Sequence, residues 1–230
     1  MLPRFILLSA VVSIPLTLGG CNFADIATQV PNAVETTRER QVSGDDEVNA
    51  GQALIEQREF AQAIEPLERA LAKPLNTYSE SIVLTMIGNC YSELEQLDQA
   101  FDYYDRAIAQ DPDNYKAYVA KGVVHRLQGD YDDAAAAYDK ALVLAPDYAE
   151  LHASIGGLAI FQDDLDKAIT HLEKAVTLDD SVAISHSNLA VAYAMVGRFD
   201  DADNQLKKAV VRGYHQPEAI KERIDQLRNL

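Results

Sequence analysis

The sequence repeats itself every 34 residues from about residue 81 to residue 216. A bulky apolar residue, an aspartate and two alanines recur at fixed places in each unit. The bulky residues are Leu97, Tyr131, Leu165 and Phe199, the aspartates Asp98, Asp132, Asp166 and Asp200, and the alanines Ala100, Ala134, Ala168, Ala202, Ala107, Ala141, Ala175 and Ala209. Units of this length cannot bury an apolar face alone, so the period predicts a stacked array of similar units.

Within a unit, the residue pattern predicts two helices joined by a turn. In residues 115–148, a first helix-forming stretch is interrupted at Gly129, and Asp132 is expected to cap the second helix. Tyr138 shares one face of this second helix with alanines three and four residues away. Pro146 cannot continue a helix and therefore ends the unit.

These recurring residues resemble the pattern of the tetratricopeptide repeat, most clearly in residues 81–114. The matching residues there are Leu84, Ile87, Gly88, Tyr91, Ala100, Tyr104, Ala107 and Pro112. The resemblance implies an all-α fold, a right-handed superhelical solenoid of helix-turn-helix repeats. The expected units are a degenerate 44–80, then 81–114, 115–148, 149–182 and 183–216. The chain departs from the family pattern at Asp180, where proline is expected, and at Ala190, where glycine is expected.

Residues 217–230 are expected to form a helix that caps the array. Pro217 suits the first turn of a helix. Ile220, Ile224 and Leu227 form one apolar stripe, and charged residues cover the rest. A terminal element with one apolar and one polar face is what the end of a solenoid requires.

The first 20 residues have the pattern of a secretory signal. Arg4 precedes an apolar run over residues 5–18, which is short for a membrane-spanning helix and contains Pro15. The residues from Leu18 to Cys21 read LGGC and resemble the bacterial lipobox. That resemblance implies cleavage before Cys21 and lipidation of its thiol, for example with palmitate. An ordinary cleaved signal and an uncleaved anchor helix remain alternatives.

The resemblance also implies a location on the bacterial cell envelope, facing the periplasm. Asn22 follows the cysteine in place of the aspartate of an inner-membrane retention signal, which favours the outer membrane. Residues 21–43 contain Pro31 and no sustained period, so we interpret them as the lipidated cysteine followed by a flexible tether.

Composition excludes several classes of function. The formal net charge of −16 repels phosphate backbones, so nucleic-acid binding is not expected. Two cysteines are too few for a disulfide scaffold, and Cys90 is interpreted as a buried, inert thiol.

No catalytic motif is visible, so we expect neither an enzyme nor a cofactor. His152 and His186 are one period apart, but packing explains them better than a metal site does, because no carboxylate or thiolate completes a ligand set. His125 stands at the repeat position that Tyr91 holds in the preceding unit. Aspartates such as Asp130 and Asp133 fall at helix starts, where they complement the helix dipole.

The family resemblance implies a concave groove lined by the second, fifth, ninth and twelfth positions of each first helix. The residues expected to contact a partner are Asn89, Lys116, Val119, Val123, Arg126, Ala153, Gly157, Ile160, Ile184 and Val191. Gly157 suggests a close approach by a partner backbone, or else relief of crowding between helices, with Ile184 and Val191 covered by the cap. The Lys and Asn clamp of chaperone-binding relatives is not reproduced.

We therefore expect a membrane-anchored scaffold or adaptor that binds protein partners through its groove. Lipoproteins that pilot pilus or secretin subunits, and those that scaffold cell-wall hydrolases, have a similar plan. The alternative is a self-associating structural lipoprotein, for example a homodimer, whose groove is filled by its own tether or by a second copy.

Overall fold

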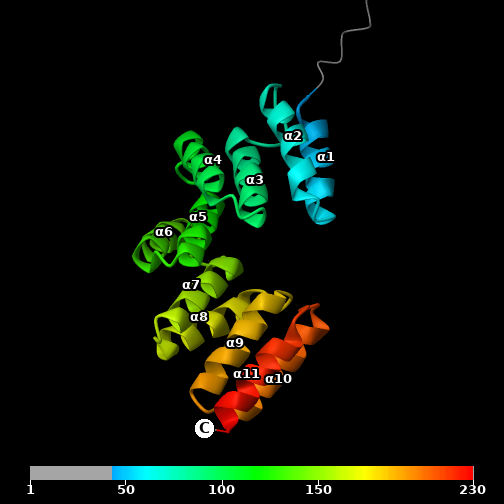
Figure 1. Cartoon of the computed structure of the whole chain (residues 1–230). Helices are drawn as coiled ribbons and strands as arrows, with labels where there is room; N and C mark the ends of the chain where they lie inside the picture. The colour runs from blue at the N-terminus through cyan, green and yellow to red at the C-terminus, as the bar shows by residue number, and fades with distance from the viewer. Residues whose placement is uncertain (1–42, 230) are drawn as a thin grey trace, which may run out of the picture. The chain divides into compact units, whose positions relative to one another are not determined.

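The computed structural model describes residues 43–229, which form eleven α-helices and no β-strand (Figure 1). The helices are α1 (Asp45–Glu56), α2 (Phe60–Leu71), α3 (Glu80–Glu93), α4 (Leu97–Gln110), α5 (Tyr115–Gln128), α6 (Tyr131–Leu144), α7 (Ala149–Phe161), α8 (Leu165–Leu178), α9 (Ala183–Met195), α10 (Phe199–Val211) and α11 (Pro217–Arg228). The all-α fold predicted from the repeat is confirmed.

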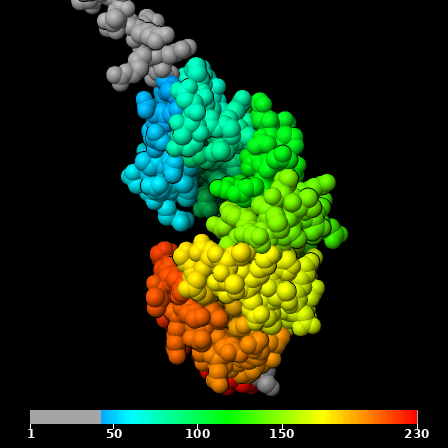
Figure 2. All heavy atoms as spheres, turned by 180° about the vertical axis from the view of Figure 1, so that it is seen from behind, coloured from blue at the N-terminus to red at the C-terminus, as the bar shows by residue number. Residues whose placement is uncertain are grey.

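The helices are arranged as antiparallel pairs that stack in chain order. The pairs are α1 with α2, α3 with α4, α5 with α6, α7 with α8 and α9 with α10, and each pair packs on the next. From α3 onward, the first helix of a pair also contacts the first helix of the following pair. The space-filling view shows the same succession, with colours following one another in the order of the sequence (Figure 2).

Each pair is held together by a small residue on its first helix and a large side chain on its second. Tyr138 of α6 is buried against Gly122 of α5, and a Cβ atom placed on Gly122 would lie 2.5 Å from the tyrosine ring. Tyr104 packs on Gly88 in the same way. The recurring glycine therefore sets how closely the two helices approach.

The turn between the two helices of a pair contains one residue with a left-handed backbone. Gly129 has φ of 87°, which glycine adopts without a steric penalty. In other units this place is held by Glu95 and Asp163, with φ of 59° and 58°. The units therefore share the backbone conformation of the turn more strictly than its residue type.

The start of α6 differs from the prediction that Asp132 caps it. The helix begins at Tyr131, its cap position is Asp130, and no side-chain hydrogen bond caps it. Because the backbone oxygen of Asp130 already accepts from the amide of Ala134, Asp132 lies within the first turn. There it stabilises the helix through its charge. A capping aspartate is found instead at α8, where Asp164 accepts from the amide of Lys167.

The last helix, α11, packs against α9 and α10. Ile224 is completely buried and belongs to the cluster that contains Ala202 and Leu206 of α10. Ile220 and Leu227 pack against the same cluster. The predicted apolar stripe of this helix therefore covers the end of the array.

The predicted signal segment, Cys21 and nearly all of the predicted tether lie outside the described residues. Within residues 43–229, none of the helices combines the length and the apolar character that crossing a bilayer requires.

Candidate functional site

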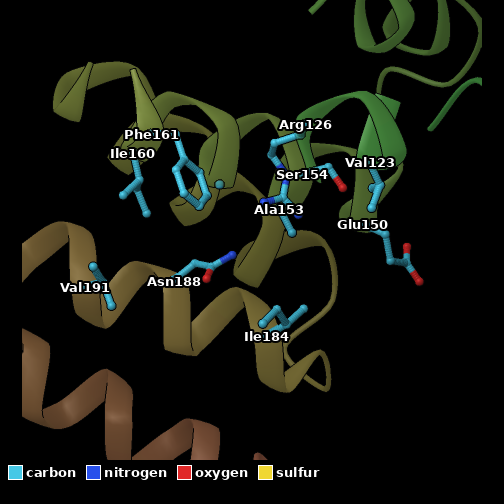
Figure 3. Close-up of a pocket in the computed structure, with 11 residues that line it drawn as sticks. Val123, Arg126, Glu150, Ala153, Ser154, Ile160, Phe161, Ile184, Asn188 and Val191 are labelled. Atoms are coloured by element: carbon cyan, nitrogen blue, oxygen red, sulfur yellow. The ribbon is translucent and has the colours of Figure 1, made fainter. Parts of the chain in front are cut away.

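Three successive first helices, α5, α7 and α9, line a cavity of about 500 Å³. Its lining residues are Val123, Arg126, Glu150, Ala153, Ser154, Gly157, Ile160, Phe161, Ile184, Asn188 and Val191. In Figure 3, side chains from the three helices converge on this space. Phe161 and Ile184 are 61% and 47% exposed, so the cavity offers apolar surface that the protein does not cover itself.

A second cavity, of about 540 Å³, continues the groove toward the N-terminal repeats. Its lining comes mainly from α1, α3 and α5 and includes Asn89 and Ser92. Val123 lines both cavities. The hydroxyl of the buried Tyr104 donates to the Oδ1 of Asn89 over 2.9 Å, which holds that amide in place at the groove surface. The first helices therefore line one groove with two adjoining hollows.

Most of the residues predicted to line the groove lie at these cavities. Those at the first cavity are Val123, Arg126, Ala153, Gly157, Ile160, Ile184 and Val191, and Asn89 lies at the second. Lys116 is exposed in the first turn of α5 but lines neither cavity. Val119 is buried in a core cluster with Tyr138 and Leu151, so it offers almost no surface to a partner.

The chain matches models of the tetratricopeptide repeat in each part of the array. The matched residues are 48–114, 85–149, 125–181 and 183–206. This chain belongs to the tetratricopeptide repeat family.

Solved structures with the same fold include tetratricopeptide proteins of several sources. A thermophilic tetratricopeptide protein of Thermus thermophilus has a TM-score of 0.67 at 22% identity, covering 82% of this chain and all of the other. The Cut9–Hcn1 hetero-tetramer of the anaphase-promoting complex has a TM-score of 0.67 at 18% identity, covering 80% of this chain and 36% of that one. MamA from Desulfovibrio magneticus has a TM-score of 0.55 at 19% identity, over 75% of this chain and 96% of the other.

Two curated relatives share higher identity over short segments. Mouse protein O-mannosyl-transferase TMTC1 is 35% identical over 81 residues, which is 35% of this chain and 9% of the relative. Anaphase-promoting complex subunit 6 of Dictyostelium discoideum is 34% identical over 64 residues, which is 27% of this chain and 7% of the relative. The chain thus spans less than a tenth of the length of either relative.

Gly157 of this tetratricopeptide protein does not relieve crowding between helices. A Cβ atom placed on it would meet only the amide nitrogen of Asn188, at the ordinary contact distance of 3.5 Å. Ile184 is exposed at the cavity rather than covered by α11. The alternative that the cap closes this part of the groove is therefore wrong for Ile184.

Sequence reasoning missed the apolar Phe161 and the polar Ser154 and Asn188 of the first cavity. These residues stand at the sixth and thirteenth positions of their units, one residue beyond the positions used for prediction. Because an α-helix has 3.6 residues per turn, the fifth and sixth positions border the same stripe, as do the twelfth and thirteenth. A wider stripe would have found them.

Arg126 supplies the one positive charge among the residues lining the first cavity. Its guanidinium lies 5.5 Å from the centre of the Phe161 ring, a distance suited to a cation–π contact. Burial raises the pKa of Tyr138, and the positive charge of Arg126 opposes that rise. Glu150 lines the same cavity, but among residues 43–229 no ion pair joins it to Arg126.

The histidines predicted to pack do so as separate pairs within their own repeats. His152 is buried and contacts His171 of α8, and His186 is buried and contacts Gln205 of α10. Each is also hydrogen-bonded to a backbone oxygen, of Pro146 and Asp180 respectively. The two imidazoles, one period apart, therefore have partners other than each other.

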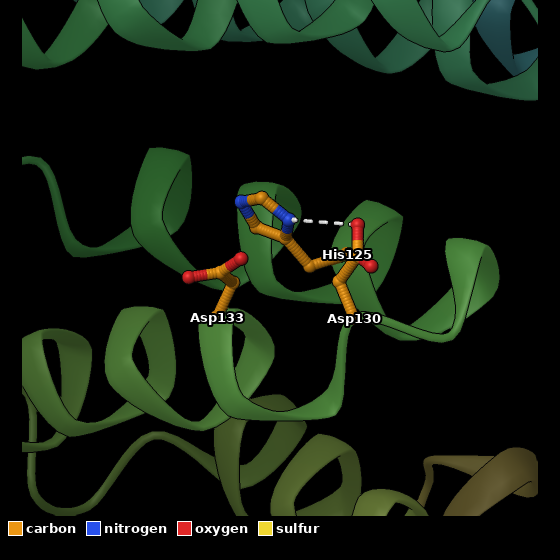
Figure 4. Close-up of side chains that lie close together, drawn as sticks. All are labelled: His125, Asp130 and Asp133. Carbon is orange, nitrogen blue, oxygen red and sulfur yellow. Dashed lines mark ion pairs between the residues drawn. The ribbon is translucent and has the colours of Figure 1, made fainter.

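The structure brings together one cluster that sequence reasoning did not assemble, formed by His125, Asp130 and Asp133 (Figure 4). One nitrogen or oxygen atom from each residue lies within 4.8 Å of the others. The signal was their spacing of five and three residues across the turn between α5 and α6. Both carboxylates are exposed, and such clusters are common on protein surfaces without a metal ion, so we assign it no ligand.

Proposed function

We propose that this protein is a membrane-anchored scaffold that holds protein partners in its concave groove on the bacterial cell envelope. The observation that carries the proposal is the 500 Å³ cavity formed by three successive repeats. Its apolar surface is exposed, and burying it under a partner segment contributes about 25 cal/mol per Å². A groove between stacked helices accepts a helical or extended segment of another protein.

A binding role is also supported by what the site lacks as a reaction centre. The first cavity presents mainly apolar side chains, and its two charged residues, Arg126 and Glu150, belong to no nucleophile and base pair. The tetratricopeptide repeat family and a relative named as a subunit of the anaphase-promoting complex are consistent with an adaptor. In the envelope, piloting of pilus or secretin subunits and scaffolding of cell-wall hydrolases are the roles we favour.

Membrane attachment through Cys21 is the second part of the proposal. The LGGC sequence supports it, together with the apolar run that precedes it. Two or more acyl chains give stable attachment, at about 0.8 kcal/mol per buried methylene group. The tether would leave the groove free to face the periplasm.

Site-specific photocrosslinking in the expressing cells tests the binding role. A photoreactive residue at Ile184 should form adducts with another protein, and the same residue at Val143 of α6 should not. Val143 is 84% exposed and lies outside both cavities, so it is a matched apolar control. Adding the substitution Phe161→Asp to this variant should abolish the adducts at position 184, because Phe161 lines the same cavity.

Adducts of twice the chain mass would instead support the self-associating alternative. The net charge of −16 opposes close contact between two copies, which is why we favour a different protein as the partner. Light scattering on the purified protein separates monomer from dimer. Equal adducts from positions 184 and 143 would contradict a role for the groove.

The anchor is tested by labelling cells with radioactive palmitate. Cys21→Ser should abolish the label, whereas Cys90→Ser should keep it. Cys90 is a suitable control because it is fully buried in α3, and burial with the nearby Glu93 charge raises its pKa to about 11. Continued labelling of the Cys21→Ser protein would overturn the anchor.

A further inference from the structure

Arg126 enters the groove as a cation without a carboxylate partner. Several other arginines are paired with a carboxylate: Arg198 binds Asp201 over 2.8 Å, and Arg228 binds Asp203 over 2.7 Å. Among residues 43–229, no carboxylate oxygen lies within 4.0 Å of the Arg126 guanidinium. Its Nε atom is shielded from solvent and has no hydrogen-bond partner there. A guanidinium carries five N–H donors, and because Arg126 lines the first cavity without an ion pair to any of residues 43–229, it has donors to offer to a ligand.

The surroundings of Arg126 favour an anionic ligand over a neutral one. The ring of Phe161, centred 5.5 Å from the guanidinium carbon, replaces part of the water around it. The Glu150 carboxylate, which points away from it in Figure 3, does not neutralise it. A charge-assisted hydrogen bond to a carboxylate is about twice as strong as a neutral one and fits the planar guanidinium with two parallel contacts.

The position of Arg126 along the groove indicates an internal residue of the partner. Arg126 lines the first cavity, and Val123, one turn before it on α5, lines both cavities, so the second cavity begins within one turn of the arginine. A partner chain that ended at Arg126 would leave one of the two cavities empty. A segment that fills both must pass the arginine with a side chain.

The chemistry of the remaining lining defines the flanking residues. Around Arg126 the first cavity is lined mainly by valine, isoleucine, alanine and phenylalanine. The net charge of −16 repels a run of acidic residues. One carboxylate between apolar neighbours is therefore favoured over an acidic tract.

We propose that the groove recognises an apolar protein segment carrying one internal aspartate or glutamate, whose carboxylate pairs with Arg126. This inference rests on the proposed function, because it names the chemistry of the partner that the groove binds. It differs from recognition of a chain terminus, since the carboxylate belongs to a side chain within the segment.

Selection from a random dodecapeptide library displayed on phage tests the proposal with the full chain purified in detergent. Enriched peptides should share one acidic residue flanked by apolar ones. Each is then synthesised with an amidated C-terminus, which removes the terminal carboxylate, and in a second form with the acid replaced by its amide. Amide replacement should weaken binding to the native protein roughly tenfold or more, because a charge-assisted bond is lost.

A double-mutant cycle assigns that loss to Arg126. On Arg126→Gln, the acidic and amide peptides should bind equally, and Arg126→Lys should restore part of the difference. Arg106→Gln is the matched control. Arg106 also lies over an aromatic ring, that of Tyr103, but on α4 and outside both cavities. Arg106→Gln removes the same charge and should leave the difference in affinity between the acidic and amide peptides unchanged.

The outcomes separate this inference from the proposed function. Peptides that lose affinity on Ile184→Asp but bind native protein and Arg126→Gln equally would overturn the inference and leave the groove as a binding site. Binding that requires a free C-terminal carboxylate would likewise overturn it. A selection that yields no peptide dependent on Ile184 would count against both the inference and the proposed function.

Discussion

The imidazoles of His152 and His171 stack on each other, with ring centroids 5.0 Å apart and Nδ1 atoms 2.9 Å apart. The Nε2 of His152 faces the backbone oxygen of Pro146 over 2.9 Å, and that oxygen only accepts. Neutral His152 therefore has its hydrogen on Nε2, and His171 must donate from its own Nδ1. One proton fits between the two Nδ1 atoms. A second proton placed between them would have no acceptor.

The histidine pair should make stability depend on pH. Burial, and next the charge of His152, lower the pKa of His171 below its ordinary value of 6.5. The folded state therefore binds this proton less readily than the unfolded state. The stability contributed by neutral His171 should be fully present above about pH 6.5 and be lost as the pH falls through the lower, folded-state pKa.

Substitution His171→Gln should reduce this pH dependence. The next repeat provides the precedent, because Gln205 holds the corresponding place against His186, at 2.7 Å. A carboxamide pairs with either protonation state of an imidazole. The measurement is the melting temperature of both proteins between about pH 7.5 and about pH 5. Parallel curves for the two proteins would show that the pair contributes nothing to the pH dependence.

The adjacent residues Gly156 and Gly157 should respond oppositely to alanine. At Gly156 the added Cβ atom would lie 2.5 Å from the Cγ of Leu172 and 3.1 Å from the backbone oxygen of Ala168, so α7 and α8 must separate. We expect Gly156→Ala to cost about 1–3 kcal/mol, as overpacking of a core does. Gly157→Ala meets no such obstacle and should stabilise the helix by up to about 1 kcal/mol.

Urea unfolding of the two glycine variants checks this prediction. The variants are matched in composition and differ by one position, so intrinsic helix propensity cannot separate them. A similar change in the unfolding midpoint for both would contradict the packing role of Gly156.

Asn114 should be the most sensitive polar residue of the array. Its side-chain nitrogen donates to Ser81 Oγ and Thr85 Oγ1 over 2.7 and 2.9 Å, and its Oδ1 caps α5 by accepting from the amide of Ala117. Asn114→Ala removes the cap and the buried hydrogen bonds together and should cost about 2–3 kcal/mol. Asn114→Asp keeps an acceptor for the cap and should lower the free energy of unfolding less. Calorimetric unfolding of both variants measures the difference. Equal losses would mean that the cap contributes nothing.

Removal of residues 217–230 should destabilise the C-terminal end of the array first. The deletion uncovers Ala202 and Leu206, which pack in the cluster that contains Ile224. In a solenoid, stability is close to a sum over neighbouring units, so the loss falls mainly on the last pair. Hydrogen exchange should accelerate in α9 and α10 and remain slow in α3 and α4. Uniform acceleration from α3 to α10 would contradict this.

The sequence by itself determined the helix pairs, the shared face of Tyr138 and its neighbouring alanines, and the capping helix. These features depend on residues at short, fixed spacings, and a repeated pattern reports them in every unit. The family resemblance also placed Ile184 and Gly157 at the groove, where both line the first cavity. The same positional rule failed for Val119, because this side chain is buried in the cluster that contains Tyr138 and Leu151.

The tertiary structure decided which side chains meet across helices. The contact of His152 with His171 and the cluster of His125 with Asp130 and Asp133 require the second helix to fold back on the first. Within residues 43–229, the lack of a carboxylate beside Arg126 likewise depends on the side chains that three separate repeats bring to one space. Local spacing specifies a helix face, whereas the partner of a charged or polar group is set by how neighbouring repeats stack.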